Sequence, residues 1–307
     1  METYQNILVV IDPDTDEQKA LARACTLAKH NGAKITALLV IYDFSYEMTT
    51  MLSVDEREAM RETVLKGRNA WLNNLLNHYT QEIDTKVIWH NRPFEATLSE
   101  VRDHYYDLVI KSTHEHPTLK SVIFTPTDWH LIRKCWVPLL LVKDHSWPKD
   151  GHILAAINAG SEEPEHQSLN NKITEEALQL ANLLSANVHL VNSYPGTPVN
   201  IAIEIPEFDP HEYNETMKKH HFEVMQQHAH KYGIDAEHLH VEEGLPEDVI
   251  DHVAKEIDAE LVILGTIGRT GLSAVLIGNT AEQVIDRLNC DLLALKPNGY
   301  ESPFLKS

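Results

Sequence analysis

Three glycines in the second half of the chain have the spacing of a phosphate-binding loop. Gly265 and Gly268 follow a short apolar run, and Gly278 immediately precedes Asn279 and Thr280, where a helical pattern begins. Glycine lets the backbone approach a ligand closely, and successive N–H groups in such a turn form an anion-binding nest. The N–H groups at the start of the following helix add further donors. The pattern therefore predicts that main-chain groups bind the phosphates of a nucleotide.

The motifs that convert phosphate binding into catalysis are missing from the sequence. The glycines are not followed by Gly-Lys-Ser or Gly-Lys-Thr, so they do not form a P-loop. The chain also contains neither Gly-x-Ser-x-Gly nor His-Glu-x-x-His. We therefore expect a protein that binds a ligand without converting it. Weak ATP hydrolysis, aided by a group such as Arg269, is the alternative.

Histidines and an aspartate occupy the corresponding stretch of the first half. His114 and His116 lie in an expected loop, and Asp128 and His130 follow on the next expected helix. Imidazole and carboxylate groups are ordinary zinc ligands. Because that loop and the helix start should lie close together, the four residues are a candidate zinc site. Exposed histidines in a surface loop are the alternative.

An unusually apolar connector, Pro195–Phe208, follows an expected strand of the second half. Such a segment either packs against another domain or chain, or covers a cavity beside the glycine loop. The second alternative predicts an apolar, lipid-like or nucleotide-linked ligand whose head-group phosphate lies on the glycines.

The elements that must position these residues occur twice along the chain. Asp107–Lys143 aligns without a gap on Glu260–Lys296 at a shift of 153 residues. Asn6–Asp12 aligns on His152–Asn158 at a shift of 146, so seven additional residues lie in the first half of the second copy. Several segments that repeat in order indicate two copies of one domain.

Each copy alternates short runs of Val, Ile and Leu with helical patterns. Such runs are typical of buried parallel strands, and the alternation predicts an α/β fold with a doubly wound, five-stranded parallel sheet flanked by helices in each copy. We place the domains at residues 1–143 and 152–307, on either side of the polar linker 144–151. The strands are expected at residues 7–11, 35–41, 85–89, 107–110 and 138–142, and at 153–157, 188–191, 238–242, 261–264 and 292–295.

The first copy has lost the glycine loop. At the 153-residue shift, Ser112, Glu115 and Thr125 stand at the positions of the three glycines, and Pro126 stands at the position of the asparagine. A carboxylate repels phosphate, and proline has no N–H group to donate. We therefore predict that only the second copy binds a nucleotide.

The composition argues against several classes of function. Lys and Arg total 26 against 46 Asp and Glu, which gives a formal charge of -20 and a surface that repels DNA and RNA. The chain has three widely spaced cysteines, and no apolar run reaches the roughly 20 residues that span a bilayer. The start of the sequence lacks the pattern of a signal peptide. We expect a cytoplasmic protein with no membrane span and no direct nucleic-acid partner.

The glycine spacing, Gly-x2-Gly-x9-Gly between a strand and a helix, resembles the nucleotide loop of the universal stress protein family. The family has Ser or Thr after the third glycine, where this chain has Asn279. Segments along nearly the whole chain also resemble tandem-type members of that family. These segments are Ile41–Thr50, Trp89–Ala96, Phe124–Cys135 and Gly278–Asp286.

The resemblance implies a strand order of 3-2-1-4-5 in each domain, with ATP bound across strands 1 and 4 of the second. It implies that Asn158, where the family has aspartate, meets the base and that Val191 lines it. It also implies that the two domains pair as a pseudo-dimer and that two chains can form a homodimer.

Together these features predict a cytoplasmic stress-response protein that confers resistance to stress, including DNA-damaging agents. Its second domain would bind ATP, and its action would be regulatory and not catalytic. One alternative is a carrier or sensor of an apolar or nucleotide-linked lipid-like ligand in a cavity of the second domain. The other is a weak ATPase.

Overall fold

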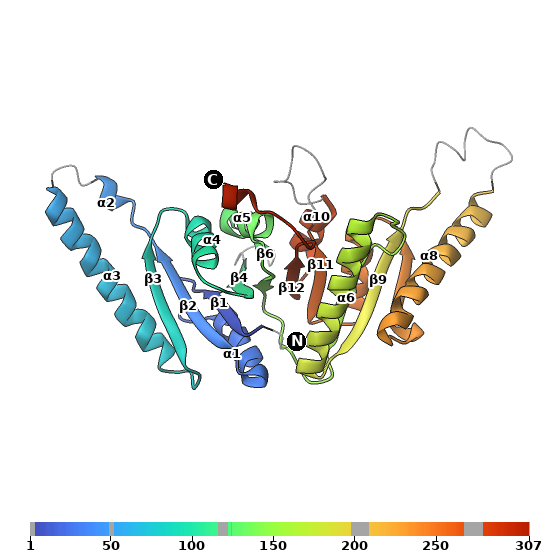
Figure 1. Ribbon diagram of the computed structural model, residues 1–307, viewed down its shortest axis with the longest axis horizontal. Coiled ribbons are helices and arrows are strands. Elements are labelled where there is room, and N and C mark those ends of the chain that lie inside the picture. The colour runs from blue at the N-terminus through green and yellow to red at the C-terminus, as the bar shows by residue number, and fades with distance from the viewer. Residues whose placement is uncertain are drawn as a thin grey trace. The chain divides into compact units, whose positions relative to one another are not determined.

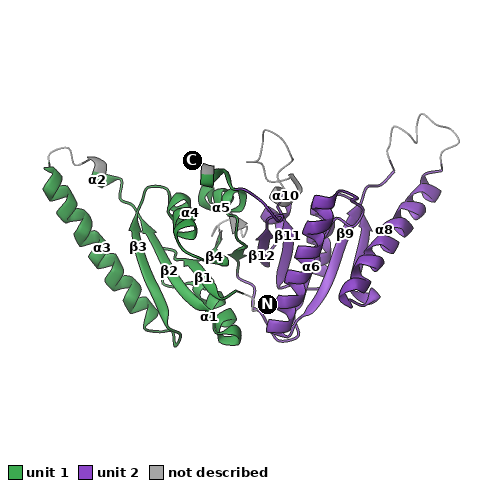
Figure 2. Ribbon diagram, viewed as in Figure 1, with its two compact units in different colours: residues 1–143, 302–307 green, residues 144–301 purple. Residues whose placement is uncertain are grey.

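A computed structural model describes residues 4–48, 52–115, 122–123, 125–197, 209–266 and 279–306 (Figure 1). For residues 47, 48, 114, 115, 122, 123, 279–282 and 306 it describes the backbone alone. The chain forms two compact units, which are residues 1–143 with 302–307 and residues 144–301 (Figure 2). No helix among the described residues is long and apolar enough to cross a membrane.

Residues 302–307, at the end of the sequence, belong to the first compact unit. From the sequence alone, they were expected in the second domain, residues 152–307. The Ser302 hydroxyl is fully buried and donates a hydrogen bond to the Lys134 carbonyl at 2.5 Å. The Arg102 guanidinium lies 5.9 Å from the centre of the Phe304 ring. Contacts over such a long sequence separation leave no local pattern, so the sequence did not reveal them.

The first unit is built on parallel strands that hydrogen-bond in the order β3-β2-β1-β4-β7. This is the expected order 3-2-1-4-5, and a short antiparallel pair, β5-β6, was not expected. The strands are β1 (Asn6–Val10), β2 (Lys34–Ile41), β3 (Ile83–Trp89), β4 (Leu108–Ser112), β5 (His114–Glu115), β6 (Val122–Ile123) and β7 (Leu139–Val142). The helices are α1 (Lys19–Asn31), α2 (Ser45–Met48), α3 (Val54–Leu76), α4 (Pro93–Asp103), α5 (Pro126–Lys134) and the 3-10 turn Pro303–Lys306.

The second unit repeats this arrangement with its parallel strands in the order β10-β9-β8-β11-β12. That order is again 3-2-1-4-5, while a separate five-stranded sheet in each unit stays a prediction. The strands are β8 (His152–Ala156), β9 (Asn187–Tyr194), β10 (Leu239–Glu243), β11 (Leu261–Gly265) and β12 (Asp291–Leu295). The helices are α6 (Pro164–Leu184), α8 (Pro210–Tyr232), α9 (Pro246–Glu256), α10 (Asn279–Arg287) and the 3-10 turn Ala236–His238.

Apolar side chains on both faces of the strands form the core of each unit. Leu154 on β8 and Val262 on β11 have no exposed surface, and the α6 residues Ile173, Ala177 and Leu180 face the strands at helical spacing. Burial of one such large side chain contributes about 1.5–3 kcal/mol. Helices α6 and α8 pack on β8, β9 and β10 (Figure 1).

The seven additional residues of the second copy extend α6 at its N-terminal end. Helix α1 has 13 residues and its C-cap is Gly32, whereas α6 has 21 and its C-cap is Ser185. The two C-caps are 153 positions apart, and both have a left-handed backbone. The helices therefore end at equivalent positions, and the additional turns of α6 lie at its start, beside the end of β8.

Candidate functional site

A cavity of about 710 Å³ opens at the carboxyl ends of the strands of the second unit. In open parallel sheets this is the edge at which ligands bind, and the volume is that of a small-molecule site. The walls come from the ends of β8, β9 and β11, the residues after β8, β9 and β10, and helices α6, α9 and α10. They are Ala156, Ile157, Asn158, His166, Leu169, Asn170, Ile173, Asn192, Ser193, Pro195, Gly196, Gly244, Leu245, Pro246, Ile250, Leu264, Gly265 and Val284.

The additional turns of α6 help to build this cavity. They carry His166 and Leu169, and both residues line it. At the 153-residue shift, the first residue of α6 corresponds to position 11 of the first unit, whereas α1 begins eight residues later, at Lys19. The first unit therefore has no helical counterpart of these turns. The length difference seen in the sequence is therefore part of the candidate site.

An asparagine on α6 holds the loop that follows β8. The Asn158 N–H donates to Oδ1 of Asn170 at 2.9 Å, and Nδ2 of Asn170 donates back to the Asn158 carbonyl at 2.8 Å. In the first unit, Gln18 makes the same reciprocal pair with the main chain of Asp12 at 3.0 and 2.8 Å. Because Asn170 fixes its backbone, Asn158 presents an exposed side chain at the cavity, where the resemblance assigns it to base recognition.

Replacement of Asn170 by alanine is expected to lower the free energy of unfolding by about 1–3 kcal/mol, because both main-chain groups of Asn158 lose their partner. Urea denaturation measures the change. Asn171→Ala is the matched control, since its side chain is not part of the pair. Equal denaturation midpoints for the two variants would show that the pair does not stabilise the loop.

Two residues of β9, Asn192 and Ser193, line the cavity, and Val191, which the resemblance assigns to the base, is not among the lining residues. Val191 is buried, does not line the cavity, and contributes its carbonyl to the Ile157 N–H at 3.0 Å. Oδ1 of Asn192 accepts from the Ala159 N–H at 2.9 Å, and its Nδ2 lies 3.0 Å from Nδ1 of His221. Burial lowers the pKa of His221, so the neutral ring accepts this hydrogen bond at Nδ1.

Gly265 lines the cavity for a reason that the sequence did not show. Its backbone does not adopt a positive φ. A Cβ atom at this position would lie 2.3 Å from Cδ2 of Leu169 and 3.3 Å from Cδ1 of Ile173. Glycine therefore allows α6 to pack closely on the end of β11. In the first unit Ser112 fits at the equivalent position, where its Oγ accepts from the Ala20 N–H at 3.0 Å.

The remaining residues of the expected glycine loop are only partly described. Gly268 and Gly278 lie outside the described residues. Asn279 and Thr280 are the first residues of α10, which confirms the helix start expected from the sequence, and only their backbone is described. Val284, one turn further along α10, lines the cavity.

A buried ion pair stands in the first unit at the position of a cavity residue of the second. Nζ of Lys111 lies 2.7 Å from Oδ1 of Asp128, whose side chain has no exposed surface. Lys111 corresponds to Leu264, which lines the cavity of the second unit. The other Asp128 oxygen accepts from the N–H and hydroxyl of Thr125, which completes a capping box on α5. Where the second unit has an apolar cavity wall, the first unit therefore has two buried charged side chains that pair with each other.

The four candidate zinc ligands are only partly described. His116 lies outside the described residues, and only the backbone of His114 is described. Asp128 is engaged by its ion pair and capping box, and the His130 ring stacks on Phe94 with 4.0 Å between ring centres. Residues two apart on a helix point in different directions. The side chains of Asp128 and His130 therefore contact different partners. Zinc at this position stays a prediction.

Three histidines of the second unit form a hydrogen-bonded chain that the sequence did not reveal. Nδ1 of His152 lies 3.0 Å from Nε2 of His189, and Nδ1 of His189 lies 3.1 Å from Nε2 of His240. Burial and the neighbouring histidines lower the pKa of His189 to about 4. Burial also lowers the pKa of His228, whose Nε2 lies 2.8 Å from the Thr174 hydroxyl, to about 4.

The buried histidines predict a loss of stability in mild acid. The unfolded chain takes up protons near pH 6.5, whereas folded His189 and His228 stay neutral down to about pH 4. The stabilisation is therefore complete above pH 6.5 and declines as the pH falls toward 4. Between pH 7 and 5 the free energy of unfolding should decrease by about 1–2 kcal/mol for each of the two rings.

Urea denaturation at pH 7, 6 and 5 measures this decrease, in a range where most carboxylates stay ionised. The variant His230→Ala, which alters an exposed histidine on α8, should keep the same pH dependence. The assignment of neutral buried rings fails if the unfolding free energy is constant between pH 7 and 5.

Comparisons with known proteins agree with this architecture. The universal stress protein family matches residues 3–143 and 152–296. The chain is 54% identical to universal stress protein E of Salmonella typhi over 99% of this chain and 98% of that protein. It is 53% identical to universal stress protein E of Escherichia coli K12 over 99% and 97% of the two chains. The crystal structure of a functionally unknown protein from Pseudomonas aeruginosa PAO1 superposes with a TM-score of 0.75 at 30% identity, covering 97% of this chain and 94% of that one. The chain therefore belongs to the universal stress protein family, as two tandem domains.

Proposed function

We propose that this stress-response protein binds ATP or a related nucleotide in its second unit and acts through partners and not through catalysis. The cavity at the carboxyl ends of β8, β9 and β11 carries this proposal, because it ends at Gly265, the first residue of the glycine loop. A nucleotide base and ribose would lie in the cavity, and the phosphates would lie on the main chain of that loop. We further propose that it acts in the cytoplasm and confers resistance to stress, including DNA-damaging agents.

The polar groups of the cavity support a ligand with a hydrogen-bonding end. Asn158, His166 and Ser193 lie on its walls. The Ser161 hydroxyl lies 2.8 Å from Nδ1 of His166, which also lies 3.2 Å from a carboxylate oxygen of Glu163. Asn158, Ser161 and Glu163 belong to the loop between β8 and α6, which Asn170 holds, whereas His166 lies on α6 and Ser193 on β9.

The apolar walls favour a second candidate, an amphipathic ligand that carries an acyl chain. Leu169 and Ile173 on α6, Ile250 on α9, Leu264 on β11 and Val284 on α10 line one continuous cavity. Its volume of about 710 Å³ is within the range of sites for drug-sized ligands. A nucleotide-linked lipid would use both the apolar walls and the glycine loop.

Calorimetric titration of the full chain with ATP, and separately with fatty-acyl ligands, tests the proposal. Native mass spectrometry of the purified chain identifies any co-purified ligand and measures whether two chains associate. One ATP per chain with increased thermal stability is the expected result. Binding of acyl ligands alone would support the second candidate. Phosphate release in the presence of ATP would instead support weak hydrolysis.

A further inference from the structure

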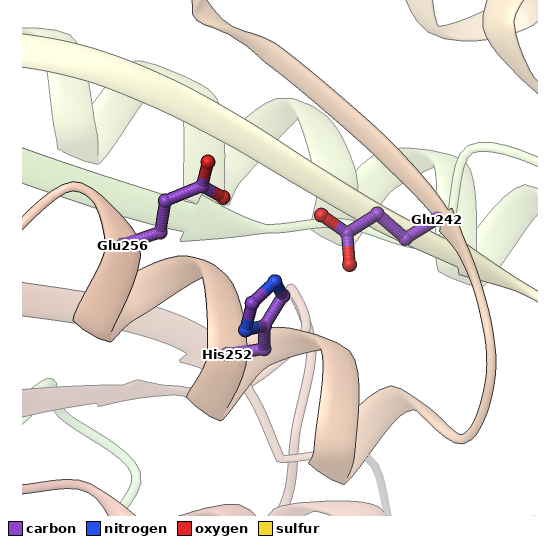
Figure 3. A group of neighbouring side chains, drawn as sticks. All are labelled: Glu242, His252 and Glu256. Atoms are coloured by element: carbon purple, nitrogen blue, oxygen red, sulfur yellow. The ribbon is translucent and has the colours of Figure 1, made fainter.

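Two carboxylates and an imidazole converge in the second unit, and none of these three residues is among those that line the cavity. Glu242 lies near the end of β10, and His252 and Glu256 lie on α9. One ligand atom from each residue lies within 4.8 Å of those from the other two. Figure 3 shows the Glu242 and Glu256 carboxylates turned toward each other, with the His252 ring beside them.

Local structure accounts for this convergence. His252 and Glu256 are four residues apart, so they share one face of α9. Helix α9 packs against β10, which brings Glu242 opposite that face. The three candidate ligands therefore come from two elements. Helix α9 contributes His252 and Glu256, and strand β10 contributes Glu242.

The charges of the group are not balanced by a neighbouring side chain in any ion pair that the structure describes. Lys255, the closest basic residue along α9, pairs with Asp251 at 2.6 Å. Two carboxylates held this close repel each other, and a bound cation would relieve that repulsion. His252 and Glu256 are exposed, so an ion can reach the group from solution.

We propose that Glu242, His252 and Glu256 bind one divalent transition-metal ion of the zinc class. An imidazole nitrogen with two carboxylate oxygens favours zinc over Mg²⁺ and Ca²⁺, which prefer oxygen ligands alone. Three protein ligands leave a fourth tetrahedral position for water. This site is separate from the candidate zinc ligands of the first unit.

The first copy provides an internal comparison. At the 153-residue shift, Trp89, Ser99 and Asp103 stand at the positions of the three ligands. Tryptophan is not a zinc ligand, and a single carboxylate with a serine does not form a comparable site. One zinc ion per chain from this site, and not two, is therefore expected.

Zinc chloride titration of the full chain, prepared without a histidine tag and stripped by a chelator, tests the proposal. Calorimetry and native mass spectrometry should give one tight zinc ion per chain that depends on this site, apart from any ion held by the candidate ligands of the first unit. His252→Ala and Glu256→Gln should each weaken its binding at least tenfold, while His230→Ala should leave it unchanged. Because both substituted ligands are exposed, circular dichroism should show an intact fold.

Three results would overturn the proposal. The first is a zinc dissociation constant above about 100 µM, because binding that weak would not indicate a specific site. The second is equal affinity in His252→Ala and the unaltered chain. The third is loss of the ion in His116→Ala together with its retention in His252→Ala, which would place zinc in the first unit.

Discussion

The variant Gly268→Glu is expected to bind ATP at least about 100-fold more weakly than the unaltered chain, a loss of about 2.7 kcal/mol. Gly268 is the second glycine of the proposed phosphate loop, and the first copy carries Glu115 at the equivalent position. A carboxylate there repels the phosphates, and two charges about 4 Å apart near a protein surface interact by about 4 kcal/mol. Calorimetric titration with ATP measures the affinity.

Gln227→Glu is the matched control, because it adds the same charge to an exposed position of α8 in the same unit. Its affinity for ATP should equal that of the unaltered chain. Unchanged affinity in Gly268→Glu would show that the loop does not hold the phosphates, even if ATP binds elsewhere in the cavity.

The second large effect is expected in the first unit. Asp128→Ala should lower its free energy of unfolding by about 3–5 kcal/mol, because the substitution leaves the Lys111 ammonium buried without its counter-charge. Loss of the capping box with Thr125 contributes about 1 kcal/mol of this effect. Four of the five tryptophans belong to the first unit, so fluorescence follows its unfolding selectively. They are Trp71, Trp89, Trp129 and Trp136.

The second copy supplies the compensating substitution. Leu264 and Ala281 stand at the positions of Lys111 and Asp128. The double variant Lys111→Leu with Asp128→Ala should therefore recover most of the lost stability, because it removes both charges together. If the double variant is no more stable than Asp128→Ala, the uncompensated lysine is not the cause of the loss.

The sequence by itself determined the strands and their order. Runs of Val, Ile and Leu marked most of the ten main strands, because parallel strands buried on both faces require apolar residues throughout. The partly buried strands β3 and β10 also carry polar residues. The internal repeat indicated two copies of one domain, and the resemblance then gave the order 3-2-1-4-5. The start of α10 at Asn279 was also predicted, because a helix N-terminus after a glycine loop has a local signature.

The candidate site was predicted only in part from the sequence. Of the residues that were assigned to the nucleotide, Gly265 and Asn158 line the cavity and Val191 does not, and their roles in nucleotide binding stay predictions. Asn170 gave no signal, because an asparagine inside a helical pattern resembles any polar helix residue.

Only the tertiary structure decided which distant residues meet. The chain of His152, His189 and His240 forms because β8, β9 and β10 lie side by side, and their registers offset neighbouring histidines by two residues, which keeps the three rings on one face of the sheet. The packing of α9 on β10 brings Glu242 to His252. Periodicity and motifs report local backbone preferences, whereas these groupings depend on strand register and helix packing, which no short stretch of sequence encodes.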